Sequence, residues 1–271
     1  MKWRGEVNGL TAEAYYPDDF AGACLRMLRR FTAKYRETGK RQILFLAAPP
    51  GAGKSTLAAF LADLSRGDAQ CEETRALGID GFHLPRAALE GKSAVRNGIT
   101  VPLREIRGAP ETFDLEALTD ALRRLKAGEN ILWPEYSRVL HDPVPGRLPV
   151  REHLVLAEGN YLLLDRPLWR DLNKFADHTM YLTADRRILR ERLIGRKVRG
   201  GMNREDAEKF VDTSDAYNIR LVGENRLEAD EIIQIRGGEK DDESIDRSTA
   251  VFGENGDAER TGHGQDAGRA S

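Results

Sequence analysis

The sequence predicts an α/β protein: a mostly parallel five-stranded sheet with helices on both faces, preceded by a small β-hairpin. Short apolar runs of strand length alternate along the chain with longer amphipathic segments of helical period. The run at residues 43–48 is apolar throughout, as expected of a central parallel strand buried on both faces. Glycine and proline separate the two kinds of segment. Together these observations indicate repeated βαβ units.

The first 40 residues predict a hairpin and one helix. Residues 1–14 read as two short strands around Asn8-Gly9, a dipeptide typical of hairpin turns. A helix is predicted over residues 17–37, ending before Gly39, because its apolar residues recur at helical spacing. Four of them share one face: Phe20, Cys24, Met27 and Phe31.

The chain then alternates strands and helices up to residue 236. Strands are predicted at residues 76–79, 153–157, 179–183 and 231–235, and helices at residues 54–65, 114–127, 186–197 and 204–212. Residues 143–149 are rich in proline and are predicted to be a connection. No boundary divides residues 1–236, so the sequence predicts one domain that includes the hairpin and the first helix.

Residues 237–271 differ in composition from the rest. They hold nine acidic and four basic residues, and their only large apolar residues are Ile245, Val251 and Phe252. Such a segment buries too little surface to offset the entropy of ordering it, so it is predicted to be a disordered acidic tail. Without it, the totals of 42 basic and 44 acidic residues fall to 38 and 35, which leaves a slightly basic body.

Composition excludes several classes of protein. Of the 271 residues 40% are hydrophobic, which is enough for a core, but no apolar run approaches the roughly 18 residues of a membrane helix. No apolar segment typical of a secretory signal follows Met1. Cys24 and Cys71 are too few for a disulfide framework or a zinc cluster. We therefore expect a cytoplasmic protein with no membrane partner, and the near-zero net charge argues against a nucleic-acid partner.

The strongest motif follows the first buried strand. It matches the phosphate-loop pattern G-x-x-x-x-G-K-[ST], with alanine in place of the first glycine, over Ala48, Pro49, Pro50, Gly51, Ala52, Gly53, Lys54, Ser55 and Thr56. Glycines let the backbone curl so that successive N–H groups point at one anion, and the following helix N-terminus adds partial positive charge. With its flanking strand and helix, the motif predicts a P-loop NTPase fold that binds ATP through residues 49–56.

Three side chains have expected roles around the phosphates. Lys54 is expected to reach the β- and γ-phosphates, and the Ser55 hydroxyl to bind Mg²⁺. Glu158 ends an apolar strand, where ligands bind in open parallel sheets, and is the second predicted Mg²⁺ residue. The alternative for Glu158 is a solvated carboxylate at a strand end.

Two further patterns bear on the reaction. Residues 173–177 (NKFAD) are one residue too long for the guanine-binding motif N-K-x-D and are interpreted as a chance match. A kinase needs a carboxylate that orients the acceptor hydroxyl and takes its proton. Asp80 ends the second short strand, beside the phosphate loop, and is the predicted base; the alternative is a turn residue before Gly81. His83 is interpreted as either a substrate contact or a surface residue.

Five segments in chain order resemble one family: residues 48–56 (APPGAGKST), 79–83 (IDGFH), 107–114 (RGAPETFD), 133–142 (WPEYSRVLHD) and 156–164 (LAEGNYLLL). The set resembles the uridine kinase, phosphoribulokinase and bacterial pantothenate kinase group of P-loop kinases, over nearly all of residues 1–236. The closest likeness is to a bacterial branch named for nucleoside/nucleotide kinases and for fructose-transport-system kinases. The resemblance implies an ATP- and Mg²⁺-dependent phosphotransferase with a small-molecule substrate, and is consistent with a homodimer.

The resemblance also assigns residues. Asp80 matches the general base of these kinases, and Glu158 matches their glutamate near Mg²⁺. The acceptor side is assigned Phe82, His83, Arg107, Tyr136 and His141. Structural alternatives stay open: a packed hairpin residue for Tyr136, and helix caps for His141 and Asp114. The surroundings that contact the base in uridine kinases are not clearly present, so the acceptor is not fixed as a nucleoside.

A basic segment near the end of the body predicts a lid. Residues 186–199 hold seven positive charges and one acidic residue, Glu191, and Gly200-Gly201 follows as a hinge. In the resembling kinases this segment, about residues 186–215 here, closes over ATP and stabilises the transferring phosphoryl group. Arg192 and Arg196 are the predicted catalytic arginines. The alternative is a solvated basic face or a site for an anionic partner.

The sequence thus predicts a kinase that phosphorylates a hydroxyl of a small metabolite, such as a sugar, a nucleoside or a pantothenate-like alcohol. Asp80 and Lys54, with Arg192 and Arg196, are its expected catalytic residues. The alternative is a regulatory P-loop protein that binds ATP, hydrolyses it slowly and has no small-molecule acceptor. A nucleic-acid-binding module built on the basic segment is the weakest candidate, because aromatic residues are not interleaved with its charges.

Overall fold

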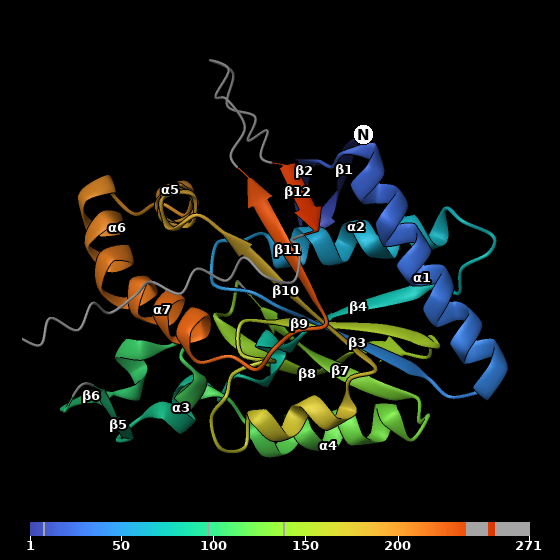
Figure 1. Cartoon of the computed structure of the whole chain (residues 1–271). Helices are drawn as coiled ribbons and strands as arrows, with labels where there is room; N and C mark the ends of the chain where they lie inside the picture. The colour runs from blue at the N-terminus through green and yellow to red at the C-terminus, as the bar shows by residue number, and fades with distance from the viewer. Residues whose placement is uncertain (8, 97, 138, 237–248, 253–271) are drawn as a thin grey trace, which may run out of the picture.

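The computed structural model describes residues 1–7, 9–96, 98–137, 139–236 and 249–252. At its centre lies a twisted sheet in the order β12-β11-β10-β3-β9-β4 (Figure 1). Its five parallel strands are β4 (Thr74–Gly78), β9 (Leu154–Gly159), β3 (Gln42–Ala47), β10 (His178–Ala184) and β11 (Glu231–Arg236). The predicted parallel five-stranded sheet is therefore confirmed.

One strand of this sheet was not expected. β12 (Thr249–Phe252) runs antiparallel beside β11, and the phenyl rings of Phe252 and Phe20 lie 5.0 Å apart. The prediction that all of residues 237–271 are disordered is wrong for these four residues, because pairing with β11 satisfies their backbone groups. The remainder of that segment lies outside the described residues.

The central strand β3 explains how the two layers of core form. All six of its residues are buried, and their side chains alternate between the faces. Ile43 and Phe45 pack with α4 (Leu115–Lys126) and β7 (Ile131–Ser137) on one face. Leu44 and Leu46 pack with α1 (Asp18–Thr38) and α2 (Lys54–Arg66) on the other. The apolar residues 43–47 of this strand are what burial on both faces requires.

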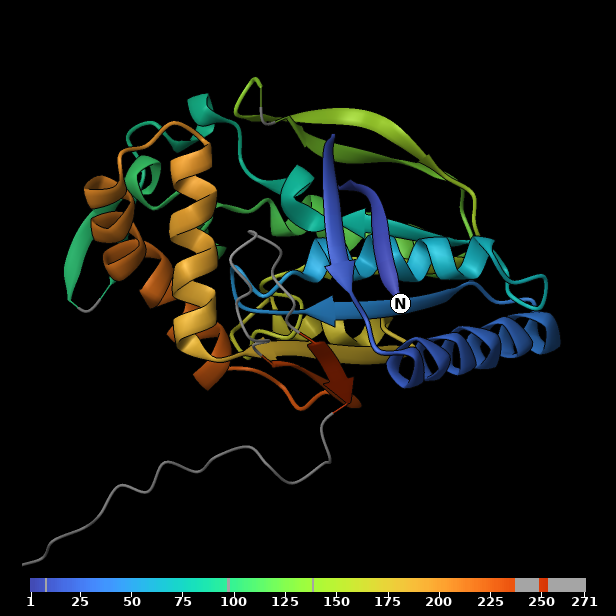
Figure 2. The same cartoon turned by 90° about the horizontal axis from the view of Figure 1, so that it is seen from above.

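The remaining helices lie beyond the carboxyl ends of the strands (Figures 1 and 2). α5 (Arg186–Arg199) and α6 (Arg204–Phe210) match the predicted helices, and a π-helical turn (Val211–Asp215) leads into α7 (Ala216–Glu224), which the sequence analysis missed. No helix within the described residues is both long enough and apolar enough to span a lipid bilayer.

In the described part of the chain, three hairpins lie outside the central sheet. The predicted N-terminal one is confirmed as β1 (Lys2–Val7) and β2 (Leu10–Tyr15). β5 (Ser93–Arg96) and β6 (Ile99–Pro102) form a second. β7 pairs with β8 (Asp142–Val150), so the prediction that residues 143–149 are a mere connection is wrong. Their prolines are tolerated because β8 is a long edge strand and its pairing with β7 is interrupted by a bulge near Pro134.

Short helical turns complete the chain. η1 (Ile79–Phe82) and α3 (Arg86–Leu89) follow β4, whereas η2 (Leu103–Ile106) and η3 (Pro110–Thr112) precede α4. η4 (Arg170–Phe175) precedes β10.

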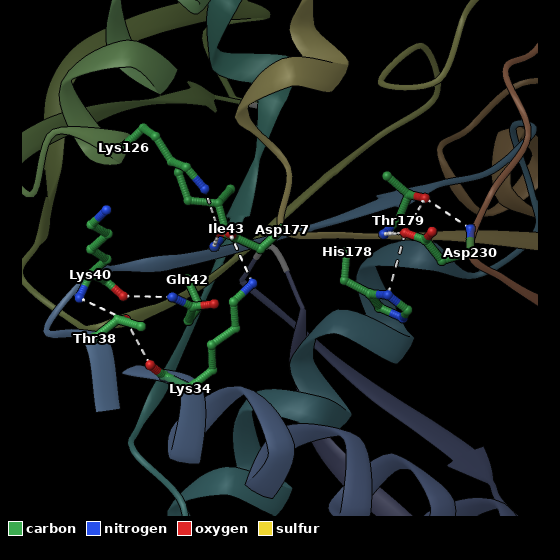
Figure 3. Close-up of polar contacts among 10 residues, drawn as sticks. All are labelled: Lys34, Thr38, Lys40, Gln42, Ile43, Lys126, Asp177, His178, Thr179 and Asp230. Carbon is green, nitrogen blue, oxygen red and sulfur yellow. Dashed lines mark hydrogen bonds and ion pairs between the residues drawn. The ribbon is translucent and has the colours of Figure 1, made fainter. Parts of the chain in front are cut away.

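Asp177 fixes the amino ends of the strands (Figure 3). Its carboxylate accepts hydrogen bonds from the backbone N–H of Ile43 at 2.9 Å, from Lys126 Nζ at 2.6 Å and from Lys34 Nζ at 3.5 Å. It therefore ties α1 and α4 to the start of β3. This edge is opposite the end of β3 that carries the phosphate loop, so the NKFAD segment, interpreted from the sequence as a chance match to a guanine motif, lies away from the nucleotide site and contributes a structural contact through Asp177.

Candidate active site

The phosphate loop connects the carboxyl end of β3 to α2. Gly51 and Gly53 have φ angles of 85° and 95°, a left-handed conformation that favours glycine. A Cβ on Gly51 would lie 3.0 Å from Leu193 Cγ and 3.1 Å from the Leu189 carbonyl oxygen, so α5 also leaves no room there. Ala48, which replaces the first glycine of the motif, is fully buried in the core. The alanine therefore fits where the chain leaves the sheet.

Glu158 lies at the end of β9, directly beside the loop. It pairs across the sheet with Leu46 of β3 and with Gly78 of β4. The Ser55 hydroxyl donates a 2.7 Å hydrogen bond to its Oε1, and Lys54 Nζ lies 3.7 Å from its Oε2. Glu158 as a whole is only 8% exposed. Burial raises the pKa of Glu158, and the charge of Asp80 raises it further, whereas Lys54 and Ser55 act in the opposite direction.

Asp80 lies in η1, two residues beyond the end of β4, and is exposed. β4 is the immediate neighbour of β9, so the chain brings Asp80 and Glu158 to the same edge of the sheet. The influence of Asp80 on the pKa of Glu158 reflects this proximity. The carboxylates of Glu158 and Asp80 and the amine of Lys54 therefore lie together beside the phosphate loop.

The basic helix α5 covers the loop from the other side. Arg192 donates a 3.2 Å hydrogen bond to the carbonyl oxygen of Ala52. Arg192, Arg196 and Arg199 line a cleft of about 360 Å³ together with residues 51–57. Two other cations of α5 have partners away from the cleft: Arg190 pairs with Asp212 at 2.7 Å, and Lys197 with Asp215 at 3.2 Å.

The predicted acceptor side is only partly assembled. His83 is buried, its ring lies 3.8 Å from that of Phe113 and 5.9 Å from that of Tyr136, and its Nδ1 lies 3.3 Å from the Thr112 carbonyl oxygen. Burial lowers the pKa of His83, which favours the neutral ring. Arg107 stands 5.7 Å above the Tyr136 ring. These residues gather between η1 and the β7–β8 hairpin, on the Asp80 side.

Two of the predicted acceptor residues are placed differently. Phe82 packs in the core, edge-on to Trp133 at 4.7 Å, and presents little surface to a ligand. His141 is exposed at the tip of the β7–β8 hairpin with a φ of 52°.

Asp142, which was not among the predicted site residues, contacts Arg107, which was. It accepts hydrogen bonds from Arg107 at 2.6 Å and from the Arg86 backbone N–H at 3.0 Å. Its position next to His141 in the segment WPEYSRVLHD was the available signal. Asp114 caps α4 through the Ala117 N–H, as the structural alternative for that residue proposed.

This combination of parallel sheet, phosphate loop and strand-end carboxylates defines a P-loop NTPase. The sequence model described as "Phosphoribulokinase / Uridine kinase family" matches residues 43–234, so the chain belongs to that family. The resemblance seen in the sequence is confirmed.

Individual relatives agree with this assignment. The chain is 38% identical over 237 residues to "Uncharacterized protein YggC" of Escherichia coli (strain K12), covering 87% of this chain and 96% of the relative. It is 30% identical over 201 residues to "Putative uridine kinase C227.14" of Schizosaccharomyces pombe, covering 72% and 83%. A crystal structure titled "putative fructose transport system kinase" from Silicibacter sp. TM1040 superposes with a TM-score of 0.68 at 31% identity, over 78% of this chain and 97% of the other. Family membership supports an ATP-dependent kinase that acts on a small molecule.

Proposed function

We propose that this protein transfers the γ-phosphoryl group of ATP to a hydroxyl group of a small metabolite. One observation carries the proposal: the buried carboxylate of Glu158 lies between Ser55 and Lys54, with Asp80 at the end of the adjacent strand. A phosphate loop serves many reactions, but a second, exposed carboxylate beside it suits an acceptor hydroxyl.

Asp80 is the proposed base. Its exposed carboxylate would accept the hydrogen bond of the acceptor hydroxyl and take its proton late in the transfer. The acceptor oxygen bonds to the γ-phosphorus as the bond to the β–γ bridging oxygen breaks, and ADP leaves. Lys54 and the α5 arginines Arg192 and Arg196 would stabilise the charge on the transferring group. In this proposal α5 acts as the lid.

The residues around Glu158 fit Mg²⁺. This ion prefers oxygen ligands, and it commonly binds through one or two carboxylates together with water and substrate phosphates. Ser55 and Glu158 offer a hydroxyl and a carboxylate within 2.7 Å of one another. A divalent cation would also compensate the buried negative charge of Glu158. When bound, Mg²⁺ would neutralise phosphate charge, while Ser55 and Glu158 hold it at the phosphate loop.

His83, Arg107 and Tyr136 support an acceptor that is polar rather than apolar. They offer an imidazole, a guanidinium and a phenol on the Asp80 side of the site. Sugars, nucleosides and pantothenate-like alcohols all provide the hydroxyl that Asp80 requires. Phe82 and His141 have no part in this proposal because the former is in the core and the latter is exposed at the hairpin tip.

The test is ATP consumption with a panel of sugars, nucleosides and pantothenate-like alcohols, followed by Asp80→Asn assayed with the substrate found. We expect Asp80→Asn to lower kcat by about 10²- to 10⁴-fold, the usual contribution of a general base, and to leave ATP affinity within a few-fold. Asp120→Asn, at an exposed carboxylate of α4 paired with Arg123, is the matched control.

Two outcomes would contradict the proposal. Full turnover by Asp80→Asn would show that Asp80 is not the general base. If no acceptor raised turnover above slow hydrolysis, and ATP instead changed association with a protein partner, the chain would be a nucleotide-dependent regulator.

A further inference from the structure

The cleft next to the phosphate loop has a second wall that is not part of the central fold. It is contributed by the N-terminal hairpin, through Val7 and four consecutive residues, Glu13, Ala14, Tyr15 and Tyr16. The phosphate loop and α5 form the facing wall, and the ends of β10 and β11 close the cleft with Leu182 and Ile235. The cleft is thus bounded by parts of the chain nearly 230 residues apart in sequence.

The hairpin crosses α2 (Figure 2) and is anchored to that helix by two aromatic side chains. The Trp3 indole N–H donates a 2.8 Å hydrogen bond to Asp63 of α2, and its ring meets Phe60 edge-on at 6.3 Å. Tyr16 stacks on Phe60 with ring centroids 4.1 Å apart. Trp3 and Tyr16 are both buried. Both anchors lie at the open end of the hairpin, where its first and last residues pair, and they attach that end to α2.

The two walls differ in chemistry. The basic side chains Lys54, Arg192, Arg196 and Arg199 come from the phosphate loop and α5, whereas Glu13, the one acidic lining residue in the described part of the chain, comes from the hairpin. Apolar and aromatic residues dominate the hairpin and strand-end side: Val7, Ala14, Tyr15, Tyr16, Leu182 and Ile235. A ligand that matches this division has several negative charges at one end and a flat, largely apolar group at the other.

The edge of β2 adds hydrogen-bonding capacity. Within the described residues β2 pairs only with β1, so its outer edge keeps unpaired N–H and C=O groups. Because Glu13, Ala14 and Tyr15 are consecutive, their side chains alternate between faces, and all three line the cleft only if this backbone edge borders it. A heteroaromatic base has both the flat face and the polar rim that such a wall can bind.

We infer that the N-terminal hairpin is the base-binding wall of the phosphate donor site, with the β2 edge, Val7 and Tyr15 contacting the nucleoside part. This inference rests on the proposed function, because it takes ATP as the ligand whose phosphates lie on residues 51–56. It adds that affinity for ATP depends on a structure outside the residues 43–234 that match the family.

The experiment compares two probes that share the phosphates and differ in the base: Mg²⁺–ATP and Mg²⁺–tripolyphosphate, each titrated by calorimetry. The wild-type protein should bind ATP at least about five-fold more tightly than tripolyphosphate, since contact with a base contributes about 1–3 kcal/mol, or roughly 5- to 150-fold. Tyr15→Ala, which removes wall surface, and Ala14→Leu, which fills the cleft, should each weaken ATP binding by about five-fold or more. Both should leave tripolyphosphate binding within two-fold, which also shows that the variants are folded.

Two control variants give the expected limits, one with no change in either affinity and one with both affinities weakened. Leu10→Ala changes an exposed side chain of the same hairpin that does not line the cleft and should alter neither affinity. Lys54→Ala should weaken both probes.

The experiment distinguishes failure of the hairpin inference from failure of the proposed function. If wild type binds ATP and tripolyphosphate equally well, or if the two wall variants leave ATP affinity unchanged or weaken both probes alike, the hairpin inference is wrong and the proposed function stands. If wild type binds neither probe, both are wrong.

Discussion

The hydroxyl of Ser55 donates a 2.7 Å hydrogen bond to the carboxylate of Glu158, a residue that is only 8% exposed. This contact joins the phosphate loop to the strand beside it. Burial raises the pKa of Glu158, so folding disfavours its ionised form. An acid with a raised pKa in the folded state contributes stability below its unfolded pKa and loses that contribution as the pH rises through the folded value.

Glu158→Gln should therefore change stability in a pH-dependent way. Without Mg²⁺ and nucleotide, we expect the variant to be at least as stable as wild type at pH 7–8, because it lacks the buried charge. The difference in unfolding free energy between the variant and wild type should shrink as the pH falls toward 4, because protonation then removes the buried charge of Glu158 from wild type as well. Urea unfolding at several pH values measures this. A variant that is less stable than wild type at pH 8 and equal at pH 4 would contradict the assignment, and loss of Mg²⁺-dependent ATP binding is the matching functional result.

Gly51→Ala should damage both stability and nucleotide binding. Its φ of 85° costs a non-glycine residue about 1–2 kcal/mol, and the new Cβ would meet Leu193 and the Leu189 carbonyl of α5. Gly39→Ala is the matched control, because its φ of 68° is similar and no neighbour lies within 4 Å of its added Cβ. Thermal unfolding and ATP titration should show a cost of about 1 kcal/mol for Gly39→Ala with normal binding, and a larger cost with weakened binding for Gly51→Ala. Equal behaviour would indicate that α5 does not pack on the loop in solution.

Arg192→Ala should lower kcat far more than Arg190→Ala. Arg192 bonds the loop at Ala52 and lines the cleft, whereas Arg190 forms its ion pair with Asp212 on the surface. An arginine that stabilises a transferring phosphoryl group contributes about 10³-fold or more, so a loss of at least 100-fold is expected for Arg192→Ala. Arg190→Ala should stay within about three-fold. Steady-state kinetics with the identified substrate measures kcat for both variants. A similar loss of kcat in the two would mean that α5 acts only through its net charge.

Asp177→Ala should destabilise the fold without altering the site. The substitution leaves the Ile43 N–H and two lysines without their shared acceptor at the amino ends of the strands (Figure 3). Loss of one buried partner and a charge-assisted bond costs about 2–3 kcal/mol. Lys34→Ala, which removes the longest of these contacts, should cost below 1 kcal/mol. Chemical denaturation measures both, while ATP affinity at 20 °C should be unchanged; a shift in affinity would show that the two edges of the sheet are coupled.

The sequence alone predicted those parts of the molecule whose signal is local. The run at residues 43–48 and the loop after it form a continuous motif, and neighbouring strands bring Glu158 and Asp80 to that loop whatever the details of the connections. Other features depend on distant partners. β12 has an acidic, glycine-rich context and forms only because β11 offers an edge and Phe20 a packing surface. β8 contains prolines that are acceptable only on an edge strand.

On the acceptor side too, the positions of single residues could not be predicted from the sequence. Tyr136 and Arg107 lie together as the family resemblance implied, but the hairpin turn exposes His141 and directs Asp142 to Arg107. A one-residue difference of this kind is set by turn geometry, which the segment WPEYSRVLHD does not specify. Phe82 could not be assigned to the core until β7 was known to bring Trp133 against it.

β12 also determines how the protein can be shortened. A chain ended at Arg236 would look complete by composition, yet it would leave the backbone groups of β11 unpaired and would remove the ring that covers Phe20. An open parallel strand beside an uncovered phenyl group is a template for association with another chain. β12 thus protects the edge of β11 from pairing with another chain. A protein shortened to remove the acidic, glycine-rich segment would also lose β12, and we expect it to aggregate.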